Sequence, residues 1–374
     1  MRILQLGKFY PVLGGVEKVM FDITSGLSET GVECDMMCAT SDGRGSEVIE
    51  LNPHGRVVCC KTWLKKARTT IAPSMITKLR RMADGYDIIH IHHPDPMAAM
   101  ALMLSGFRGK VVLHWHSDIL SQKTLLKFYL PIQNWLIKRA DAIVGTSPVY
   151  LAESPYLQKV QDKTRCIPIG IVPNRSDSAK VQSIRNEYAG RKIIFSLGRL
   201  VEYKGYRYLI EAAKYLDDSH IILIGGGGPL KDELQSQIDG LEVGNCVKLL
   251  GKVSDEDLPS YYGACDLFCL SSIMKTEAFG IVQIEAMSEG RPLIATKIPA
   301  SGVAWVNEDG VSGINVEPCD SKAIAEAIMT ITKDPETWTR FSEGSRRRFA
   351  ENFTKEKMLA DCRRLYTELL GEQA

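Results

Sequence analysis

Short apolar runs rich in Val, Ile and Leu alternate along this chain with longer amphipathic stretches. In the first part, such runs occupy residues 2–7, 32–39, 87–93, 110–116 and 141–147. In the second part, they recur at 192–200, 220–228, 246–253, 264–272 and 291–298. The stretches between them repeat apolar positions at spacings of about three and four, which is typical of helices. Continuous apolar strands that alternate with helices predict parallel sheets covered on both faces, and therefore an α/β protein with two Rossmann-like domains.

The boundary between the two domains is expected near residues 170–180, where Pro173, Asn174 and a polar run interrupt the periodicity. A chain of 374 residues is also too long for one hydrophobic core. We therefore expect an N-terminal domain over 1–170 and a C-terminal domain over 171–355. The amphipathic helix in 356–374 is expected to pack back, on the N-terminal domain.

Two acids stand at the ends of an almost unbroken apolar stretch, at Glu277 and Glu285. Burying a carboxylate is costly unless a partner compensates it. The stretch follows the predicted strand 264–272, and a helix should open at Gly280. At 1.5 Å per helical residue the two acids would lie about 12 Å apart, which is roughly the reach from a sugar through a diphosphate to a ribose.

This arrangement suits a nucleotide-sugar. Glu277 would accept hydrogen bonds from sugar hydroxyls and Glu285 from ribose hydroxyls. The free amides near Ala278, Phe279 and Gly280 would face phosphate, because a helix N-terminus attracts anions. The competing interpretation is that Glu277 only favours the helix N-terminus electrostatically and that Glu285 is a solvated acid.

Several motifs, in this order and spacing, resemble family 4 of the retaining glycosyltransferases with the GT-B fold. They are P-x-x-GG-x-E (Pro11, Gly14, Gly15, Glu17), GR-x4-KG (Arg199, Lys204, Gly205), a Gly-rich turn at 225–228, E-x7-E (Glu277, Glu285) and a closing helix preceded by Phe-Thr. The resemblance covers essentially the whole chain. It implies two Rossmann-like domains that face each other across a cleft, with the donor bound mainly by the C-terminal domain and the acceptor by the N-terminal one.

Two cations are expected to hold the leaving diphosphate. Arg199 and Lys204 lie in the loop after a predicted strand, and fixed positive charges can stabilise a departing diphosphate without a metal. The family resemblance places both at that group. Gly14 and Gly15 let the backbone approach a ligand closely and are expected to border the donor phosphates. Backbone groups at Lys252 and Val253 are expected to read the base.

Five of the seven histidines fall between residues 90 and 116, which raises the possibility of a metallohydrolase. The HxHxDH pattern of one hydrolase class fails here, because Pro94 stands where its Asp should be. The resemblance instead places His116 beside the donor sugar, where it can donate a hydrogen bond to a hydroxyl or help order the acceptor. Ser254 and Asp257 are interpreted as a helix cap rather than a metal-binding DxD. We therefore predict no cofactor and no metal, with Glu277, His116, Arg199 and Lys204 as the catalytic set.

The net charge is only +1, but it is unevenly distributed. Residues 54–140 hold 14 basic and 4 acidic side chains. This excess, which includes Lys65, Lys66, Lys123 and Lys127, predicts docking on an anionic membrane surface or on a lipid-linked acceptor. A solvated basic face is the alternative. No nucleic-acid partner is expected.

Other features favour the cytoplasm, with peripheral attachment to the inner face of the cytoplasmic membrane. The chain begins with a strand pattern rather than a signal peptide, and its longest apolar runs are too short to span a bilayer. Ten cysteines occur without a CxxC pair, which is typical of reduced thiols.

The segment 116–155 is similar to bacterial O-antigen mannosyltransferases and their relatives, which favours GDP-mannose as donor and an O-antigen or related cell-surface glycan as product. A UDP-hexose donor remains open. So do a GT-B nucleotide-sugar epimerase, which would need no acceptor, and a noncatalytic sugar-nucleotide sensor.

Overall fold

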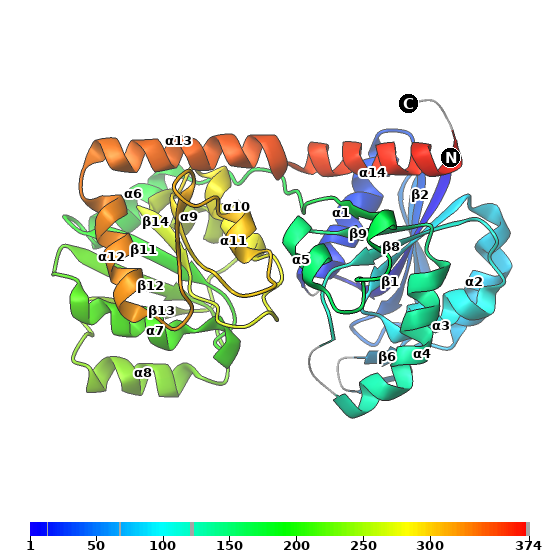
Figure 1. The fold of residues 1–374 in the computed structure, drawn as a ribbon, viewed down its shortest axis with the longest axis horizontal. Helices are drawn as coiled ribbons and strands as arrows, with labels where there is room; N and C mark the ends of the chain where they lie inside the picture. Colours follow the sequence, from blue (N-terminus) through cyan, green and yellow to red (C-terminus); the bar gives the residue numbers. More distant parts are fainter. Residues whose placement is uncertain (13, 67–68, 120–122, 372–374) are drawn as a thin grey trace. The chain divides into compact units, whose positions relative to one another are not determined.

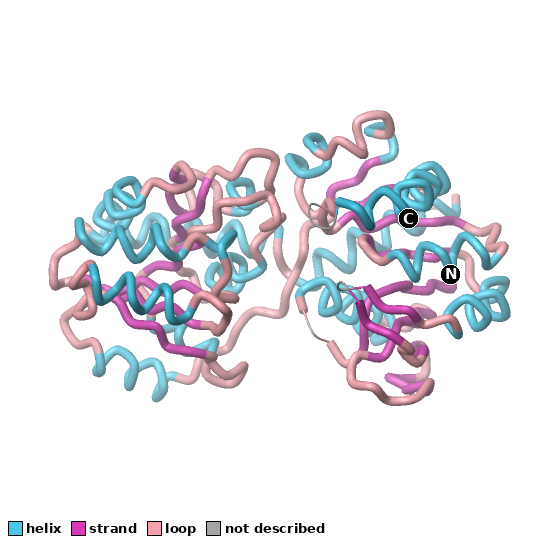
Figure 2. Tube along the Cα trace, turned by 90° about the horizontal axis from the view of Figure 1, so that it is seen from below, coloured by secondary structure: helices cyan, strands magenta, loops and turns pink. Residues whose placement is uncertain are grey.

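The computed structural model describes residues 1–371, except for 13, 67–68 and 120–122. The chain divides into two compact units. The first unit comprises residues 1–170 together with 355–374, and the second comprises 171–354. In each unit the strands lie between layers of helices (Figure 1 and Figure 2).

The first unit is built on an eight-stranded sheet with the order β10-β9-β8-β7-β1-β2-β4-β3. Its strands are β1 (Arg2–Tyr10), β2 (Glu33–Thr40), β3 (Glu47–Asn52), β4 (Gly55–Cys60), β7 (Ile88–His93), β8 (Lys110–Trp115), β9 (Ala142–Gly145) and β10 (Thr164–Cys166). All pairs are parallel except β3 with β4. β5 (Leu64–Lys66) and β6 (Thr69–Ile71) form a separate antiparallel pair. The carboxyl ends of the parallel strands therefore share one edge, where ligands of such sheets bind.

Helices cover this sheet on both faces. They are α1 (Gly15–Glu29), α2 (Ser74–Met82), α3 (Pro96–Ser105), α4 (Lys123–Arg139), α5 (Pro148–Glu153) and α14 (Lys355–Leu370), with short 3-10 turns η1 (Ala83–Gly85) and η2 (Gln161–Lys163). The start of α3 follows from sequence. The carboxylate of Asp95 accepts from the amides of Met97 and Ala98, and Pro96 occupies the first helical position.

The last helix, α14, returns to the first unit and packs against α1 (Figure 1). A glycine permits this contact. A Cβ atom on Gly26 would lie 2.4 Å from Cδ1 of Leu359 and 3.0 Å from Cε of Lys355. The close approach of α14 brings the buried Tyr366 over the central strands of the sheet, where its hydroxyl meets Gln5 on β1.

The second unit has a six-stranded, wholly parallel sheet with the order β13-β12-β11-β14-β15-β16. Its strands are β11 (Lys192–Leu197), β12 (His220–Gly225), β13 (Val247–Gly251), β14 (Leu267–Leu270), β15 (Leu293–Thr296) and β16 (Gly313–Val316). Its helices are α6 (Ser178–Glu187), α7 (Tyr206–Ala212), α8 (Lys231–Gly240), α9 (Leu258–Ala264), α10 (Ile281–Ser288), α11 (Val303–Val306), α12 (Ser321–Thr332) and α13 (Pro335–Asn352), with η3 (Glu202–Lys204) and η4 (Ala213–Tyr215). Fully buried aliphatic side chains of β11, β12, β14 and β15 form its core.

The helix that carries Glu285 opens where the sequence predicted, with Gly280 as the N-cap residue of α10. α10 begins at Ile281, so Glu277 lies in the preceding loop and only Glu285 is helical. The separation of about 12 Å assumed 1.5 Å per residue over all eight positions, and that rise applies only within a helix. The sequence-based separation of about 12 Å between the two acids therefore rests on a wrong assumption, because four of the eight steps lie outside the helix.

Candidate active site

The site in the second unit centres on an ion pair between Lys204 and Glu277. Nζ of Lys204 lies 2.5 Å from Oε2 of Glu277, and the two side chains are only 9% and 13% exposed. The hydroxyl of Ser272 donates to the same oxygen at 3.2 Å. Among the described residues, Oε1 of Glu277 has no hydrogen-bond partner. The carboxylate is thus fixed through one oxygen and can accept from a ligand hydroxyl through the other.

Glycine holds Lys204 at the end of β14. Gly205 directly follows η3 and has φ +66°, a conformation that other residues rarely adopt. A Cβ atom at this position would lie 2.2 Å from the carbonyl oxygen of Ser271. The hydroxyl of Ser271 in turn donates to the carbonyl of Lys204 at 3.0 Å. The GR-x4-KG motif therefore needs its second glycine so that the lysine loop can press against the strand that leads to Glu277.

The loop before α10 presents amides to the same place. Gly280 caps the helix with φ +77°. The carbonyl of Ala278 accepts from the amide of Gly302, which anchors the loop. Within the described part of the chain, the N–H groups of Ala278, Phe279 and Gly280 have no partner. Unpaired amides at the N-terminus of a helix form an anion-binding site.

Glu285, one turn inside α10, is held from a neighbouring helix. The hydroxyl of Tyr262 on α9 donates to Oε2 of Glu285 at 2.7 Å. Burial, and then the charge of Glu285, raise the pKa of Tyr262 well above its usual range. The tyrosine therefore remains a hydrogen-bond donor at physiological pH. Glu285 is oriented by a buried side chain, which is unlike the solvated acid of the competing interpretation.

The side chain of Arg199, by contrast, is not held by an ion pair with any described residue. It is exposed in the loop after β11. Lys252 is likewise exposed, and Val253 is half-buried, just after β13. The structure thus brings Lys204 and Glu277 together and leaves Arg199 and Lys252 pointing to no protein partner among the described residues.

The glycine-rich turn after β12 is required for packing. Gly226 has φ +131°, and a Cβ atom there would lie 1.9 Å from the carbonyl oxygen of Gly198. A Cβ on Gly228 would lie 2.4 Å from the carbonyl oxygen of Leu200. These glycines let the turn lie directly on the loop that carries Arg199. Gly227 alone has open space around its Cβ direction.

Gly14 and Gly15 lie in the first unit, at the start of α1. Gly14 has φ −158°, which is extended backbone that any residue can adopt. A Cβ there would meet Oε2 of Glu17 at 3.0 Å. Both glycines are exposed, so the N-terminus of α1 is open to a ligand.

The histidines of the first unit form a stack on one face of the sheet. His90 and His92 on β7 and His114 and His116 at the end of β8 alternate along their strands, so their rings share that face. The rings of His114 and His116 lie 4.0 Å apart at 9°, and those of His92 and His114 lie 5.1 Å apart at 25°. Burial lowers the pKa of each of the four, that of His114 to about 3, so the rings are neutral. His116 is 5% exposed at the carboxyl end of β8.

This stack does not fit a metal ion, although nitrogens of His90, His92 and His114 lie within 4.8 Å of one another. An imidazole lone pair lies in the plane of its ring, and nearly parallel stacked rings do not direct their lone pairs to one point. Both nitrogens of His92 are also engaged, by His116 and Gln5. The hydroxyl of Ser254 accepts from the amide of Asp257 at 3.1 Å, but α9 begins at Leu258 and its N-cap residue, Asp257, makes no side-chain cap hydrogen bond. The pair therefore forms a turn before the helix, and the predicted helix cap is wrong.

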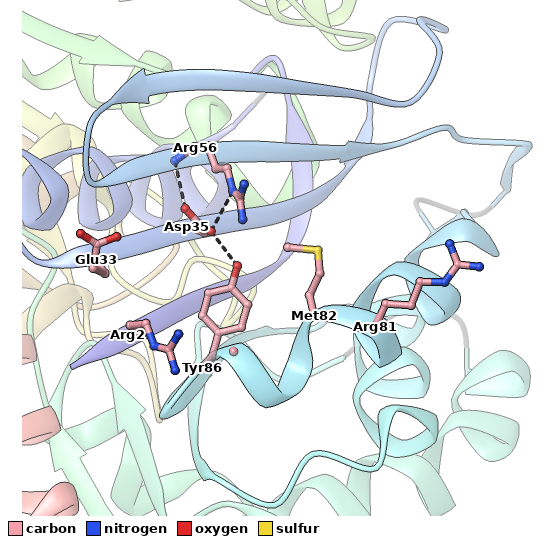
Figure 3. Close-up of a pocket in the computed structure, with 8 residues that line it drawn as sticks. Arg2, Glu33, Asp35, Arg56, Arg81, Met82 and Tyr86 are labelled. Atoms are coloured by element: carbon pink, nitrogen blue, oxygen red, sulfur yellow. Dashed lines mark hydrogen bonds and ion pairs between the residues drawn. The ribbon is translucent and has the colours of Figure 1, made fainter.

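A pocket of about 410 Å³ lies elsewhere on the first unit. Its lining includes Arg2, which begins β1, and Glu33, which begins β2, so it opens at the amino ends of the parallel strands. Asp35 there accepts from Arg56 at 3.0 Å and from Tyr86 at 2.6 Å (Figure 3). This is the edge opposite to His116, so the pocket is separate from the site.

The predicted basic surface includes large exposed apolar side chains. Trp63 is 71% exposed before β5, and Phe128 is 78% exposed on α4. Helix α3 packs against both α4 and β6, which places these side chains on neighbouring elements. Lys65 and Lys127 are exposed there, whereas the side chains of Lys66 and Lys123 lie outside the described residues. No helix among the described residues is long and apolar enough to cross a membrane.

Two units, each built on a largely or wholly parallel sheet with helices on both faces, have the architecture of the GT-B fold. Residues 13–175 match the family model "Glycosyltransferase Family 4", and residues 177–348 match "Glycosyl transferases group 1". The chain belongs to glycosyltransferase family 4, which confirms the family and the fold predicted from its motifs.

Several relatives match over nearly the full length, and two of these are at least 30% identical. The O-antigen chain mannosyltransferase C of Escherichia coli is 34% identical over 100% of both chains. The D-rhamnosyltransferase WbpZ of Pseudomonas aeruginosa is 30% identical over 95% of this chain and 92% of its own. Among solved structures, HepE of Anabaena in complex with UDP has a TM-score of 0.77 at 22% identity, covering 98% of this chain and 100% of its own. Sucrose-phosphate synthase of Thermosynechococcus elongatus has a TM-score of 0.78 at 23% identity, covering 99% and 100%.

Sequence reasoning missed the residues that hold the site. Ser272, Tyr262 and Gln5 each bond to a predicted site residue or its neighbour, but none stands in a motif. Only the alternation along β1 and β7 offered a signal, because it places a polar Gln5 among buried aliphatic residues.

Proposed function

We propose that this protein is a retaining hexosyltransferase that moves mannose from GDP-mannose to a lipid-linked or growing saccharide, without a metal ion. The observation that carries the proposal is the pair of Lys204 and Glu277 beside the amides of residues 278–280, which have no partner in the described part of the chain. The pair offers a cation for a diphosphate and a free carboxylate oxygen for a sugar hydroxyl. Such positioned charges stabilise a transition state in which negative charge develops on the leaving group.

The proposed chemistry needs no protein nucleophile. The acceptor hydroxyl attacks the anomeric carbon from the face that the diphosphate leaves, so the bond to the diphosphate oxygen breaks as the new glycosidic bond forms. The proton of the acceptor passes to the leaving phosphate oxygen, and the anomeric configuration is retained. Lys204 and Arg199 neutralise the diphosphate, Glu277 holds the sugar, and Glu285 holds the ribose. The protein contributes positioning and charge stabilisation.

The donor and the acceptor are proposed from the relatives. One of them is an O-antigen chain mannosyltransferase and another is a D-rhamnosyltransferase. GDP-mannose is therefore the first choice of donor, a nucleotide-linked D-rhamnose is the second, and UDP-hexoses complete the test. A product in O-antigen or a related cell-surface glycan follows from the same relatives.

The basic surface with Trp63 and Phe128 is proposed to dock on an anionic membrane at the inner face of the cytoplasmic membrane. Aromatic side chains that are more than 70% exposed, beside lysines, suit the boundary between lipid headgroups and acyl chains. Such docking would bring a lipid-linked acceptor to the first unit.

The test is nucleotide release by the full-length protein with each donor, with and without a lipid-linked saccharide acceptor. We expect release from GDP-mannose that rises strongly when acceptor is present, and a product whose anomeric configuration matches the donor. Tyr86→Phe, at the opposite edge of the sheet, is the matched control for activity. Absence of release from every donor would overturn the transferase proposal. Conversion of the donor to another sugar without acceptor would support the epimerase instead.

A further inference from the structure

A continuous chain of hydrogen bonds runs from His116 into the first unit and ends beneath α14. Nε2 of His116 lies 2.9 Å from Nδ1 of His92, and Nε2 of His92 lies 2.8 Å from Oε1 of Gln5. Nε2 of Gln5 donates to the hydroxyl of Tyr366 at 3.2 Å. The hydroxyl of Tyr366 lies 2.6 Å from Nδ1 of His90. The chain joins β8, β7, β1 and α14, and every member is at most 5% exposed.

The chain has a direction because each neutral imidazole carries one proton. The amide oxygen of Gln5 faces His92, so His92 holds its proton on Nε2 and donates it to that oxygen. Nδ1 of His92 is then a bare acceptor, and His116 must donate to it from Nε2. The remaining nitrogen of His116, Nδ1, consequently carries a lone pair. At the other end, the Tyr366 hydroxyl accepts from Gln5 and donates to His90.

We infer that His92, Gln5 and Tyr366 act as positioning residues that keep the proton of His116 on Nε2 and leave its Nδ1 to accept a hydrogen bond from a substrate hydroxyl. The role in substrate binding rests on the proposed transferase function, whereas the proton position does not. His116 then accepts from a hydroxyl, whereas the sequence analysis expected it either to donate to a sugar hydroxyl or to help order the acceptor. Within the described residues Nδ1 of His116 has no partner.

His114 holds the ring of His116 without competing for its proton. The two rings stack at 4.0 Å, and neither nitrogen of His114 has a hydrogen-bond partner among the described residues. Stacking therefore sets the plane of the His116 ring, and the chain through His92 sets which nitrogen carries the proton. Helix α14 contributes Tyr366 to this hydrogen-bond chain, and the Tyr366 hydroxyl holds the side-chain amide of Gln5 in one orientation.

Nitrogen-15 NMR of the full-length protein with labelled histidine tests the proton position directly, because protonated and bare ring nitrogens have distinct chemical shifts. The His116 signals are assigned by their loss in His116→Gln. We expect His116 to be neutral with its proton on Nε2 at pH 7.5. A proton on Nδ1 of His116 in the wild-type protein would overturn the inference, whatever the variants do.

Variants test whether the chain sets that position. Gln5→Met removes both hydrogen bonds at the centre of the chain, and Tyr366→Phe removes the hydroxyl that fixes the amide. We expect both to give a mixture of His116 tautomers. Tyr86→Phe removes a tyrosine hydroxyl that bonds Asp35 and should leave the His116 signals unchanged. Unchanged His116 signals in folded Gln5→Met and Tyr366→Phe would show that the chain is only structural.

Kinetics then separate this inference from the proposed function. With GDP-mannose and acceptor, Gln5→Met should lower kcat by up to about 100-fold, with a smaller change in donor KM, because a substrate hydroxyl that loses its acceptor on His116 no longer holds the substrate in the reactive position. Wild-type kcat in a variant with mixed tautomers would overturn the role in substrate binding. If the wild-type protein turned over no donor, the transferase proposal would fail while the NMR result on His116 stood.

Discussion

Nζ of Lys204 lies 2.5 Å from Oε2 of Glu277, and both side chains are almost buried although they come from loops after different strands. Nearly buried charges of this kind are tolerated only because each compensates the other. The pair thus links the stability of the second unit to the proposed donor site. A change at either residue should affect folding and catalysis together.

Glu277→Gln should lower turnover strongly and stability moderately. The substitution keeps size and removes the charge that faces the developing positive charge at the anomeric carbon. We expect kcat to fall by about 30- to 1,000-fold, equivalent to about 2–4 kcal/mol. Because Lys204 then lacks its counter-charge, the midpoint of thermal unfolding should also fall by several degrees. Glu233→Gln, which breaks the exposed pair with Arg207 at 3.0 Å, is the control and should change neither quantity. Wild-type kinetics in Glu277→Gln would remove the basis of the donor site.

Glu285→Gln should act on donor binding rather than on turnover. Its hydrogen bond to the ribose is made equally in the ground and transition states, so we expect donor KM to rise about 10-fold with a smaller effect on kcat. Tyr262→Phe removes the hydroxyl that orients Glu285 and should raise donor KM in the same direction by less. Steady-state kinetics over a range of donor concentrations measure both. A Glu285→Gln variant that loses kcat and keeps KM would mean that the sugar and the ribose are exchanged along the helix.

The α/β class and the ten strands expected from apolar runs were predictable because parallel strands buried on both faces need continuous Val, Ile and Leu. All ten correspond to strands of the structure. β3 was missed because its burial alternates at the edge of the sheet. β16 is as long as β9, β14 and β15, but it was missed because Gly313 and Asn315 interrupt its apolar run. The predicted strands 192–200 and 220–228 extend beyond the ends of β11 at Leu197 and β12 at Gly225. Each continues into glycines with positive φ, Gly198 and Gly226, which end the strand.

The site was predictable only where a motif carried it. Lys204 and Glu277 stand in two separate motifs, and nothing in the sequence indicated that they pair with each other. Their contact depends on Gly205, whose left-handed backbone lets one loop press on the next strand. The chain from His116 to Tyr366 was beyond sequence reasoning altogether, because the two residues are 250 positions apart and meet only when α14 returns to the first unit.

Acid should destabilise the first unit steeply. Burial lowers the pKa of His90, His92, His93, His114 and His116, that of His114 to about 3. Each is neutral in the folded state but takes up a proton near pH 6.5 when unfolded. The stability they contribute is therefore complete above pH 6.5 and is lost as pH falls from there toward 3. Each such proton changes the free energy of unfolding by about 1.4 kcal/mol per pH unit within this window.

Urea unfolding at pH 7.5, 6.0 and 5.0 measures this loss of stability, and amide hydrogen exchange at the same pH values locates it in the structure. The second unit is an internal control, because His220 is its only histidine in the sequence. Amides of β7 and β8 should lose protection at a higher pH than those of β11 and β12. Equal acid sensitivity of the two sheets would contradict the assignment of the effect to the buried histidines.

Chelation should leave activity nearly intact. The ring planes of the histidine stack do not converge on an ion, and the proposed site assigns the diphosphate to Lys204 and Arg199. Turnover of GDP-mannose should therefore be the same within error before and after EDTA, and after re-addition of Mg²⁺ or Mn²⁺. Loss of activity with EDTA, together with stoichiometric zinc or manganese in the purified protein, would reverse the proposed roles of both His116 and Lys204.

Binding to anionic vesicles should depend on the basic and aromatic residues of the first unit. Attraction to an acidic lipid surface contributes about 1 kcal/mol per nearby basic residue, so reversing Lys65 and Lys66 to Glu should weaken sedimentation with phosphatidylserine vesicles by more than 10-fold. Trp63→Ala should weaken it further at high salt, where apolar insertion remains and charge attraction is screened.

The control applies the same change of charge away from this surface, at two exposed lysines of the second unit. The double variant Lys214→Glu with Lys231→Glu should have little effect on vesicle binding. Equal weakening by both pairs would show that only total charge matters. Binding that ignores salt and both pairs would leave the exposed Trp63 and Phe128 without a lipid partner.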